Sequence, residues 1–146
     1  MHILIIDGMG GGLGKSIIEH IKSELADAKI TAVGTNSIAT TAMIKAGANY
    51  GATGEHAVIF NCMKVDFIIG VMGIAFANSI HGEISPKMAE AVSSSPAHKI
   101  LLPIDRCNVS ILGVSGLSVQ SYIAEIAQKI RERMLKNFDK VPLRNQ

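Results

Sequence analysis

The strongest constraint on the fold is a run of glycines between an apolar segment and an amphipathic segment near the start of the chain. Five of the eight residues from Asp7 to Gly14 are glycine. The preceding run, 2–6, is short, continuous and apolar, as buried strands are. The following run, 13–25, has apolar residues at helical spacing with charged residues between them, which predicts an amphipathic helix. A strand, a glycine-rich turn and a helix in this order are typical of the start of a Rossmann-like domain.

The rest of the chain continues the alternation of strands and helices. The run 109–114 follows the strand that we expect at 99–104, after only four polar residues. A link this short cannot hold a crossover helix. We therefore expect 109–114 to be a strand that pairs antiparallel with 99–104. The pattern predicts an α/β, Rossmann-like fold: a mainly parallel sheet of about five strands, helices on both faces, and the last strand antiparallel. We expect further strands at 29–33, 66–71 and 99–104, helices at 37–45, 55–63, 86–93 and 118–138, and a loop at 47–54.

Length and composition bound the domain count and the partners. A chain of 146 residues predicts one domain over 1–146, closed by a helix and basic tail at 118–146. Apolar residues make up 48% and aromatic residues 4%, which predicts an aliphatic core with some apolar surface left for a second copy, hence a homo-oligomer. The formal charge of +2 gives no reason to expect a nucleic-acid partner.

The apolar segments and the cysteines point to the cytoplasm. The longest apolar stretch, 67–77, is broken by Gly70 and Gly73 and is shorter than the about 20 residues that a membrane helix needs. The first residues lack the pattern of a secretion signal. Cys62 and Cys107 show no Cys-x-x-Cys spacing, so we expect two free thiols and no metal site. Together with the apolar segments, this predicts a cytoplasmic protein without a membrane partner.

The glycine-rich turn has the composition of a phosphate-binding loop. Glycine allows positive φ and close approach of the backbone, and the helix that follows offers free N–H groups. Packing of the helix on the strand is the structural alternative. A P-loop would use Gly14, Lys15 and Ser16 but needs glycine where Met9 stands. The residues predicted to hold the phosphates are Asp7, Gly8, Gly10, Gly11, Gly12 and Gly14.

The spacing of Gly8, Gly12 and Gly14 resembles the cofactor turn of the short-chain dehydrogenases, a Rossmann family that uses NAD or NADP. That resemblance covers about the first third of the chain and implies a nucleotide cofactor. Asp7 departs from it, because the family usually has threonine or serine there, and a carboxylate beside a pyrophosphate is repulsive unless it caps the loop or holds a metal ion. The family's catalytic Tyr-x-x-x-Lys is also absent, so its reaction is not predicted.

A wider resemblance covers nearly the whole chain. The sequence is similar to a family of short bacterial proteins known only as a domain of unknown function, which implies a Rossmann-like fold but no activity. The segments that carry this resemblance include Asp7–Lys15, Gly34–Asn36, Lys45–Asn49, Gly51–Glu55, Gly82–Ile84 and Arg106–Asn108.

Polar residues after the later strands complete the candidate site. Thr35, Asn36 and Ser37 follow the second strand, where a carboxylate would favour NAD, so their lack of charge favours NADP. Asn36 or Ser37 is equally suited to capping the next helix. The weak candidates for catalysis are His81 and Glu83, which alternate in a loop as an acid and base pair could, and Cys107 beside Arg106.

Two classes of function stay open at this point. One is a protein that binds a nucleotide cofactor of the NADP or NAD type; if it is an enzyme, it is an NADP-dependent oxidoreductase. The other is a non-enzymatic nucleotide sensor or assembly subunit that acts through an apolar interface. Dehydrogenases normally carry a second domain for the substrate, so at this length an oligomer must complete the site or there is no catalysis.

Overall fold

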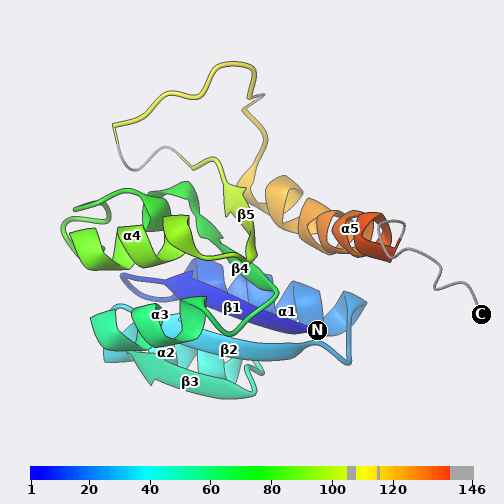
Figure 1. Cartoon of the computed structure of the whole chain (residues 1–146), viewed down its shortest axis with the longest axis horizontal. Coiled ribbons are helices and arrows are strands. Elements are labelled where there is room, and N and C mark those ends of the chain that lie inside the picture. Colours follow the sequence, from blue (N-terminus) through cyan, green and yellow to red (C-terminus); the bar gives the residue numbers. More distant parts are fainter. Residues whose placement is uncertain (105–107, 115, 139–146) are drawn as a thin grey trace, which may run out of the picture.

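The computed structural model describes residues 1–104, 108–114 and 116–138. Five parallel strands form one sheet in the order β3-β2-β1-β4-β5 (Figure 1). The strands are β1 His2–Asp7, β2 Lys29–Gly34, β3 Tyr50–Thr53, β4 Phe67–Val71 and β5 His98–Leu102. The helices are α1 Gly12–Glu24, α2 Ser37–Lys45, α3 Glu55–Cys62, the 3-10 turn η1 Met72–Ala75, α4 Pro86–Ser94 and α5 Val119–Phe138.

The order of the strands places a crevice at the carboxyl end of β1. The chain runs from β1 outward to β2 and β3, then returns to add β4 on the other side of β1. The loops that follow β1 and β4 therefore leave the sheet toward opposite sides. Ligands of open α/β sheets bind at such a switch point, so the glycine-rich turn after Asp7 lies where this architecture places a ligand.

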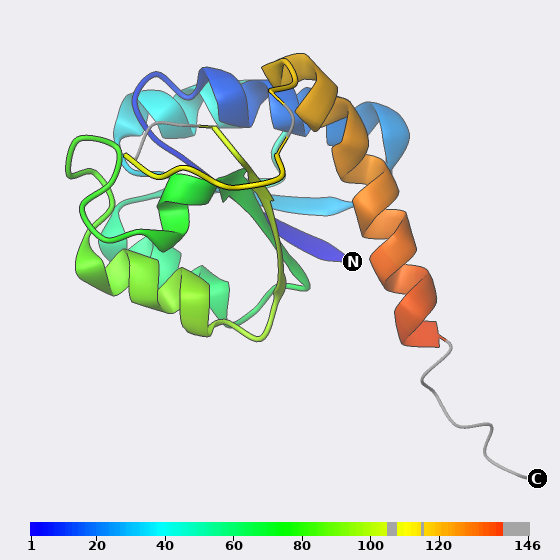
Figure 2. The same ribbon diagram turned by 90° about the horizontal axis from the view of Figure 1, so that it is seen from above.

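Two helical layers cover the sheet (Figure 2). Ile3 and Ile5 of β1 pack with α1, α2 and α5, whereas Leu4 and Ile6 pack with α3 and α4. Both faces of the central strand are thus buried, which is why its sequence is continuously apolar rather than alternating. The predicted α/β class, with helices on both faces, is confirmed.

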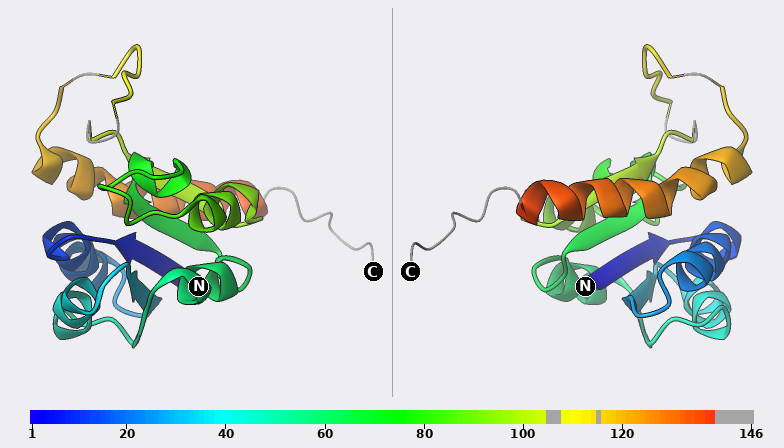
Figure 3. Two further views of the ribbon diagram at one scale, coloured as in Figure 1. Left: turned by 90° about the vertical axis from the view of Figure 1, so that its left-hand side faces the viewer. Right: turned by 90° about the vertical axis from the view of Figure 1, so that its right-hand side faces the viewer.

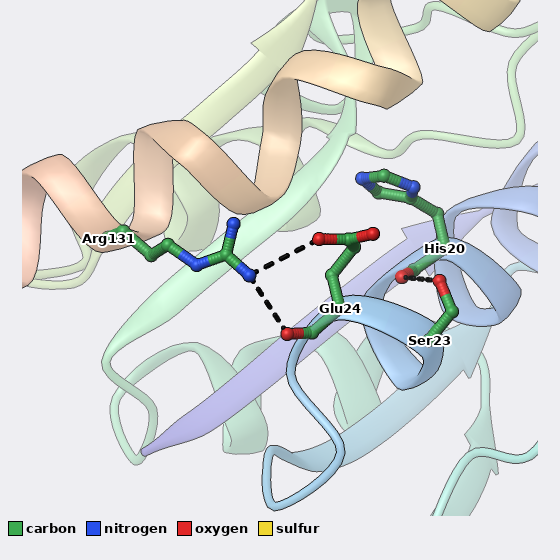
Figure 4. Close-up of polar contacts among 4 residues, drawn as sticks. All are labelled: His20, Ser23, Glu24 and Arg131. Atoms are coloured by element: carbon green, nitrogen blue, oxygen red, sulfur yellow. Dashed lines mark hydrogen bonds and ion pairs between the residues drawn. The ribbon is translucent and has the colours of Figure 1, made fainter.

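The closing helix is fixed to the end of α1 by both packing and charge. Ile123, Ile126 and Ile130 of α5 are buried against the α1 side of the sheet. The Arg131 guanidinium donates to the carbonyl of Glu24 at 3.0 Å and approaches its carboxylate at 3.3 Å (Figure 4). A cation at the carboxyl end of a helix also interacts favourably with the negative end of the helix dipole. The predicted helix at 118–138 is confirmed at Val119–Phe138, whereas the basic tail beyond Phe138 lies outside the described residues.

Side chains cap the starts of two helices, and Asn36 is one of the two caps considered for the first of them. The Asn36 side-chain oxygen accepts from the N–H of Ala39 at 2.9 Å, and the Ser85 hydroxyl accepts from the N–H of Met88 at 3.2 Å. Each side chain satisfies an N–H group that the first helical turn leaves without a partner. The caps therefore fix where α2 and α4 begin.

The segment predicted to be a loop at 47–54 contains a strand, so that prediction is wrong. β3 pairs with β2 from Tyr50 to Thr53. Its sequence hides the strand because it is short and largely exposed, with a glycine at position 51. Ile44 of α2 packs there, and a β-carbon on Gly51 would lie 2.4 Å from the Ile44 side chain. Tertiary contacts with α2 therefore select a residue that local propensity disfavours in strands.

The expected antiparallel strand at 109–114 is also wrong. All five strands are parallel, and the described residues 108–114 form bends and a turn that leave the body of the molecule (Figures 1 and 3). Leu112 is 96% exposed. A strand needs a sheet edge beside it as well as a β-prone sequence. β5, the final strand of the sheet, ends at Leu102 before Pro103, which has no N–H to extend the ladder.

No helix within the described ranges is both long enough and apolar enough to span a bilayer.

Candidate functional site

The carboxylate of Asp7 holds the glycine-rich turn together. Asp7 is 8% exposed at the end of β1, and its two oxygens accept from the N–H of Gly8 at 2.8 Å and of Gly14 at 2.7 Å. These bonds tie the end of the strand to the first turn of α1. Capping of the loop, one of the two roles that could reconcile a carboxylate with this position, is therefore what the structure contains. Hydrogen bonds to an ionised carboxylate are stronger than neutral ones, so the turn is preorganised.

Three of the five glycines have close neighbours that leave little room for a β-carbon. Gly11 has a φ of +73°, and a β-carbon on it would lie 2.7 Å from the Ala39 Cα of α2. On Gly14 a β-carbon would lie 2.5 Å from the Met43 sulfur, and on Gly8 it would lie 2.3 Å from a Glu83 carboxylate oxygen. These positions let α1 and α2 approach each other and let Glu83 approach the turn.

The other two glycines of the turn face open space. A β-carbon on Gly10 or Gly12 would meet no atom within 4 Å. Within the described part of the chain, the N–H groups of Gly10, Gly12 and Leu13 donate to no protein acceptor. Three unused donors at the amino end of a 13-residue helix form a site that suits an anion. Packing and anion binding are thus assigned to different glycines of one turn.

A cavity of about 400 Å³ opens beside these donors. One wall is the turn itself, and the rest is largely apolar and comes from the end of β4, the loop before α4, the segment after β5 and the start of α5. Its volume lies in the range of small-molecule sites, which combine apolar walls with a few polar groups. Apart from residues of the turn, the cavity is lined by Ser16, Val71, Ile80, Ile104, Val119 and Gln120.

Glu83 connects the loop before α4 to the turn and to the end of β2. One oxygen accepts from the Met9 N–H at 2.8 Å and from the Thr35 hydroxyl at 2.7 Å, and the other accepts from the Asn36 amide at 3.2 Å. Asn36 also donates to the Met9 carbonyl at 2.9 Å. Partial burial raises the pKa of Glu83, but these hydrogen bonds and the nearby His81 outweigh it, so the net shift of the pKa is downward. Glu83 is therefore held as an anion.

The cofactor-binding candidates after β2, which are Thr35, Asn36 and Ser37, do not line the cavity. Thr35 and Asn36 bond to Glu83, and neither lines the cavity. Ser37 lies in a separate shallow hollow between α1 and α2, together with Lys15. Lys15 pairs with Glu19 at 3.9 Å and lines this hollow, not the cavity beside the turn.

Two of the candidates for catalysis, His81 and Glu83, do not line the cavity either. His81 is exposed, and Glu83 is engaged by three donors. Cys107 lies outside the described residues, as does Arg106. Cys62 is a free, buried thiol, and burial raises its pKa to about 11. Within the described ranges no group of three or more His, Cys, Asp or Glu side chains is placed to hold a metal ion.

Comparison with known proteins gives a family. The family model for a domain of unknown function, DUF3842, matches residues 2–135. The chain belongs to this family. The predicted resemblance to an uncharacterised family is thus confirmed. The glycine-rich turn, the residues after β2 and the loop that carries Glu83 all lie within the matched residues. No curated protein matches the chain.

Two solved structures are similar to this chain at low identity. A dodecameric FMN-dependent UbiX-like decarboxylase from Escherichia coli O157:H7 is 17% identical, with a TM-score of 0.43, over 92% of this chain and 76% of that one. An arsenate reductase in an intermediate state is 10% identical, with a TM-score of 0.44, over 91% of this chain and 98% of that one.

Sequence reasoning missed the apolar wall of the cavity. Val71, Ile80, Ile104 and Val119 come from four separate parts of the chain, and each reads as an ordinary core residue. It also missed the partnership of Glu83 with Met9, which joins residues 74 positions apart. The one available signal was positional: Val71 and Ile104 end predicted strands, and strand ends meet at one edge of a parallel sheet.

Proposed function

We propose that this protein binds a nucleotide in the cavity beside the glycine-rich turn. The observation that carries the proposal is the pairing of three unused N–H donors, on Gly10, Gly12 and Leu13, with an apolar wall across a cavity of about 400 Å³. The donors suit a phosphate, and the apolar wall suits a flat ring. The switch-point position supports the same assignment.

The cofactor that we propose is of the NAD or NADP type, with no preference for NADP. The sequence argument for NADP rested on the lack of a carboxylate after β2. Glu83 brings a carboxylate to Thr35 and Asn36 from another loop, and it would repel a 2′-phosphate there. The position of Lys15 in the separate hollow favours this type of turn over a P-loop that holds ATP or GTP.

Binding without catalysis is the second candidate, and the cavity lining favours it. Among the described lining residues, Asp7 is the only one with an acidic or basic side chain, and both of its oxygens already accept from the turn. General acid–base catalysis needs a group within reach of the substrate that is free to exchange a proton. A cytoplasmic nucleotide sensor therefore fits these residues better than an oxidoreductase does.

We also propose that the protein self-associates through the segment that precedes α5, at 108–114 and 116–118. Apolar side chains in this segment are exposed, which is unusual in a monomer unless they meet a partner. A second copy is the simplest such partner, because most soluble oligomers are homo-oligomers. The exposed apolar residues here are Ile111, Leu112, Val114 and Leu117.

A melting-temperature screen tests the nucleotide proposal. NADP, NADPH, NAD, ATP and coenzyme A are added to the wild type, where a ligand at 100 times its Kd adds about 2.7 kcal/mol to stability. A β-carbon on Gly12 would meet no atom within 4 Å, so Gly12→Val places its side chain in the space above the turn. It should abolish the ligand shift and leave the ligand-free melting temperature nearly unchanged.

Lys15→Ala is the matched control on the same helix. We expect it to keep most of the ligand shift, because its side chain lies away from the cavity. If Gly12→Val binds as well as the wild type, the turn does not hold the phosphate. If Lys15→Ala is the more damaging change, the turn acts as a P-loop and the ligand is ATP or GTP.

A further inference from the structure

The loop between η1 and α4, at 76–85, forms part of the wall of the proposed site. Ile80 lines the cavity, and Glu83 binds the glycine-rich turn through the Met9 N–H at 2.8 Å. Ile80 belongs to the apolar wall, and Glu83 adds a carboxylate that would repel a 2′-phosphate beside Thr35 and Asn36. That carboxylate is an anion bound to a turn that we expect to bind anions.

The backbone of this loop is strained. Asn78, Ile80 and His81 have φ values of 64°, 54° and 53°, in the left-handed region that side chains other than glycine rarely adopt. A β-branched residue such as Ile80 is a clear outlier in this region. Strain of this kind persists only where other contacts hold it, and it is concentrated in ligand clamps and switch regions.

Bonds within the loop make it a compact unit. The Asn78 N–H donates to the Ile84 carbonyl at 2.7 Å, and the Ile84 N–H donates to the Ser79 carbonyl at 3.2 Å. The side-chain bonds of Glu83, by contrast, all leave the loop, to Met9, Thr35 and Asn36. The carboxylate of Glu83 is therefore a principal polar link between this unit and the turn.

The Met9 N–H belongs to the same series of turn donors as those of Gly10, Gly12 and Leu13. The Glu83 carboxylate lies directly against the turn, since a β-carbon on Gly8 would be 2.3 Å from it. A phosphate bound to the open donors would lie beside this carboxylate, and two anions at such a distance repel each other. Binding of the phosphate and docking of Glu83 therefore oppose each other.

We propose that Glu83 is a built-in anion that competes with the phosphate of the ligand, so that the loop at 76–85 is a latch released when a nucleotide binds. This inference rests on the proposed function and adds its regulation. The resting protein keeps the latch closed through Met9, Thr35 and Asn36. Ligand binding is weakened by the fraction of molecules in which the latch is closed.

The test compares binding of inorganic pyrophosphate, NAD and NADP by isothermal titration calorimetry. We expect Glu83→Ala to bind pyrophosphate and the preferred nucleotide about 10-fold or more tightly than the wild type, since it removes the competitor. Glu83→Gln keeps the length of the side chain but not its charge, so it should gain less, and it tests the charge if Glu83→Ala fails to fold. Glu90→Ala removes an exposed carboxylate on α4 and should match the wild type.

Hydrogen exchange gives a readout in the wild type itself. Saturating pyrophosphate should speed exchange of the Gly82, Glu83 and Ile84 amides, because the strained loop loses the Glu83 contacts that hold it and its internal hydrogen bonds then open more often. Unchanged exchange there, or binding to Glu83→Ala that is no tighter than to the wild type, would overturn the latch and leave the proposed function standing. Absence of binding by the wild type and by both Glu83 variants would overturn both.

Discussion

Substitution of alanine for Gly11 or for Gly12 should separate the packing role of the turn from its binding role. Gly11 has a φ of +73°, and a left-handed backbone costs a residue with a β-carbon about 1–2 kcal/mol. The new β-carbon would also lie 2.7 Å from the Ala39 Cα, so α1 and α2 would have to move apart. Overpacking of this kind costs about 1–3 kcal/mol. We therefore expect Gly11→Ala to lower the free energy of unfolding by about 2–5 kcal/mol, a large share of the usual 5–15 kcal/mol.

Gly12→Ala is the matched comparison one residue along the chain. Its β-carbon meets no atom within 4 Å, and Gly12 is the first residue of α1. Loss of backbone freedom in the unfolded chain should leave its stability unchanged or raised by up to about 1 kcal/mol. Urea unfolding followed by circular dichroism measures both variants, and calorimetry should show Gly11→Ala melting at least about 4 °C lower than the wild type. Equal stability of the two variants would refute the division of the turn into packing and binding glycines.

Three further predictions concern the burial and charge of single residues. Alkylation without reductant should label both Cys62 and Cys107 in urea, but in the native protein Cys62 should react far more slowly, because it is buried and its pKa is raised to about 11; rapid native labelling at Cys62 would contradict this. The pKa of Glu83 is lowered from 4.5 in the folded state, so the stability that its ionised form contributes is complete above pH 4.5 and disappears as the pH falls through the folded value. The difference in unfolding free energy between the wild type and Glu83→Gln should therefore shrink in acid, and a difference that grows there would reverse the assigned sign. Leu112→Asp should shift sedimentation toward a monomer of 15.5 kDa, since Leu112 is 96% exposed; a wild type that is already monomeric at micromolar concentration would remove the self-association proposal.

The sequence determined the local elements and their alternation. Continuous apolar runs such as 3–6 indicate strands buried on both faces, and Asn36 and Ser85 mark helix starts because their side chains satisfy N–H groups nearby in the chain. The glycine-rich turn was also visible from the sequence, since five glycines between an apolar run and an amphipathic run favour a tight turn from strand to helix. These features depend on neighbours within a few residues, which is the range over which sequence patterns are informative.

The tertiary structure decided the edges of the sheet and the composition of the site. β3 forms because it pairs with β2 and because Ile44 of α2 packs against Gly51. The segment 109–114 forms no strand in spite of its apolar sequence. Glu83 reaches Met9, Thr35 and Asn36 only after the chain has crossed the sheet, and the cavity wall is assembled from separate strand ends and a distant helix. Strand pairing and site assembly depend on contacts between residues far apart in sequence, and the burial and register that create those contacts exist only in the folded chain.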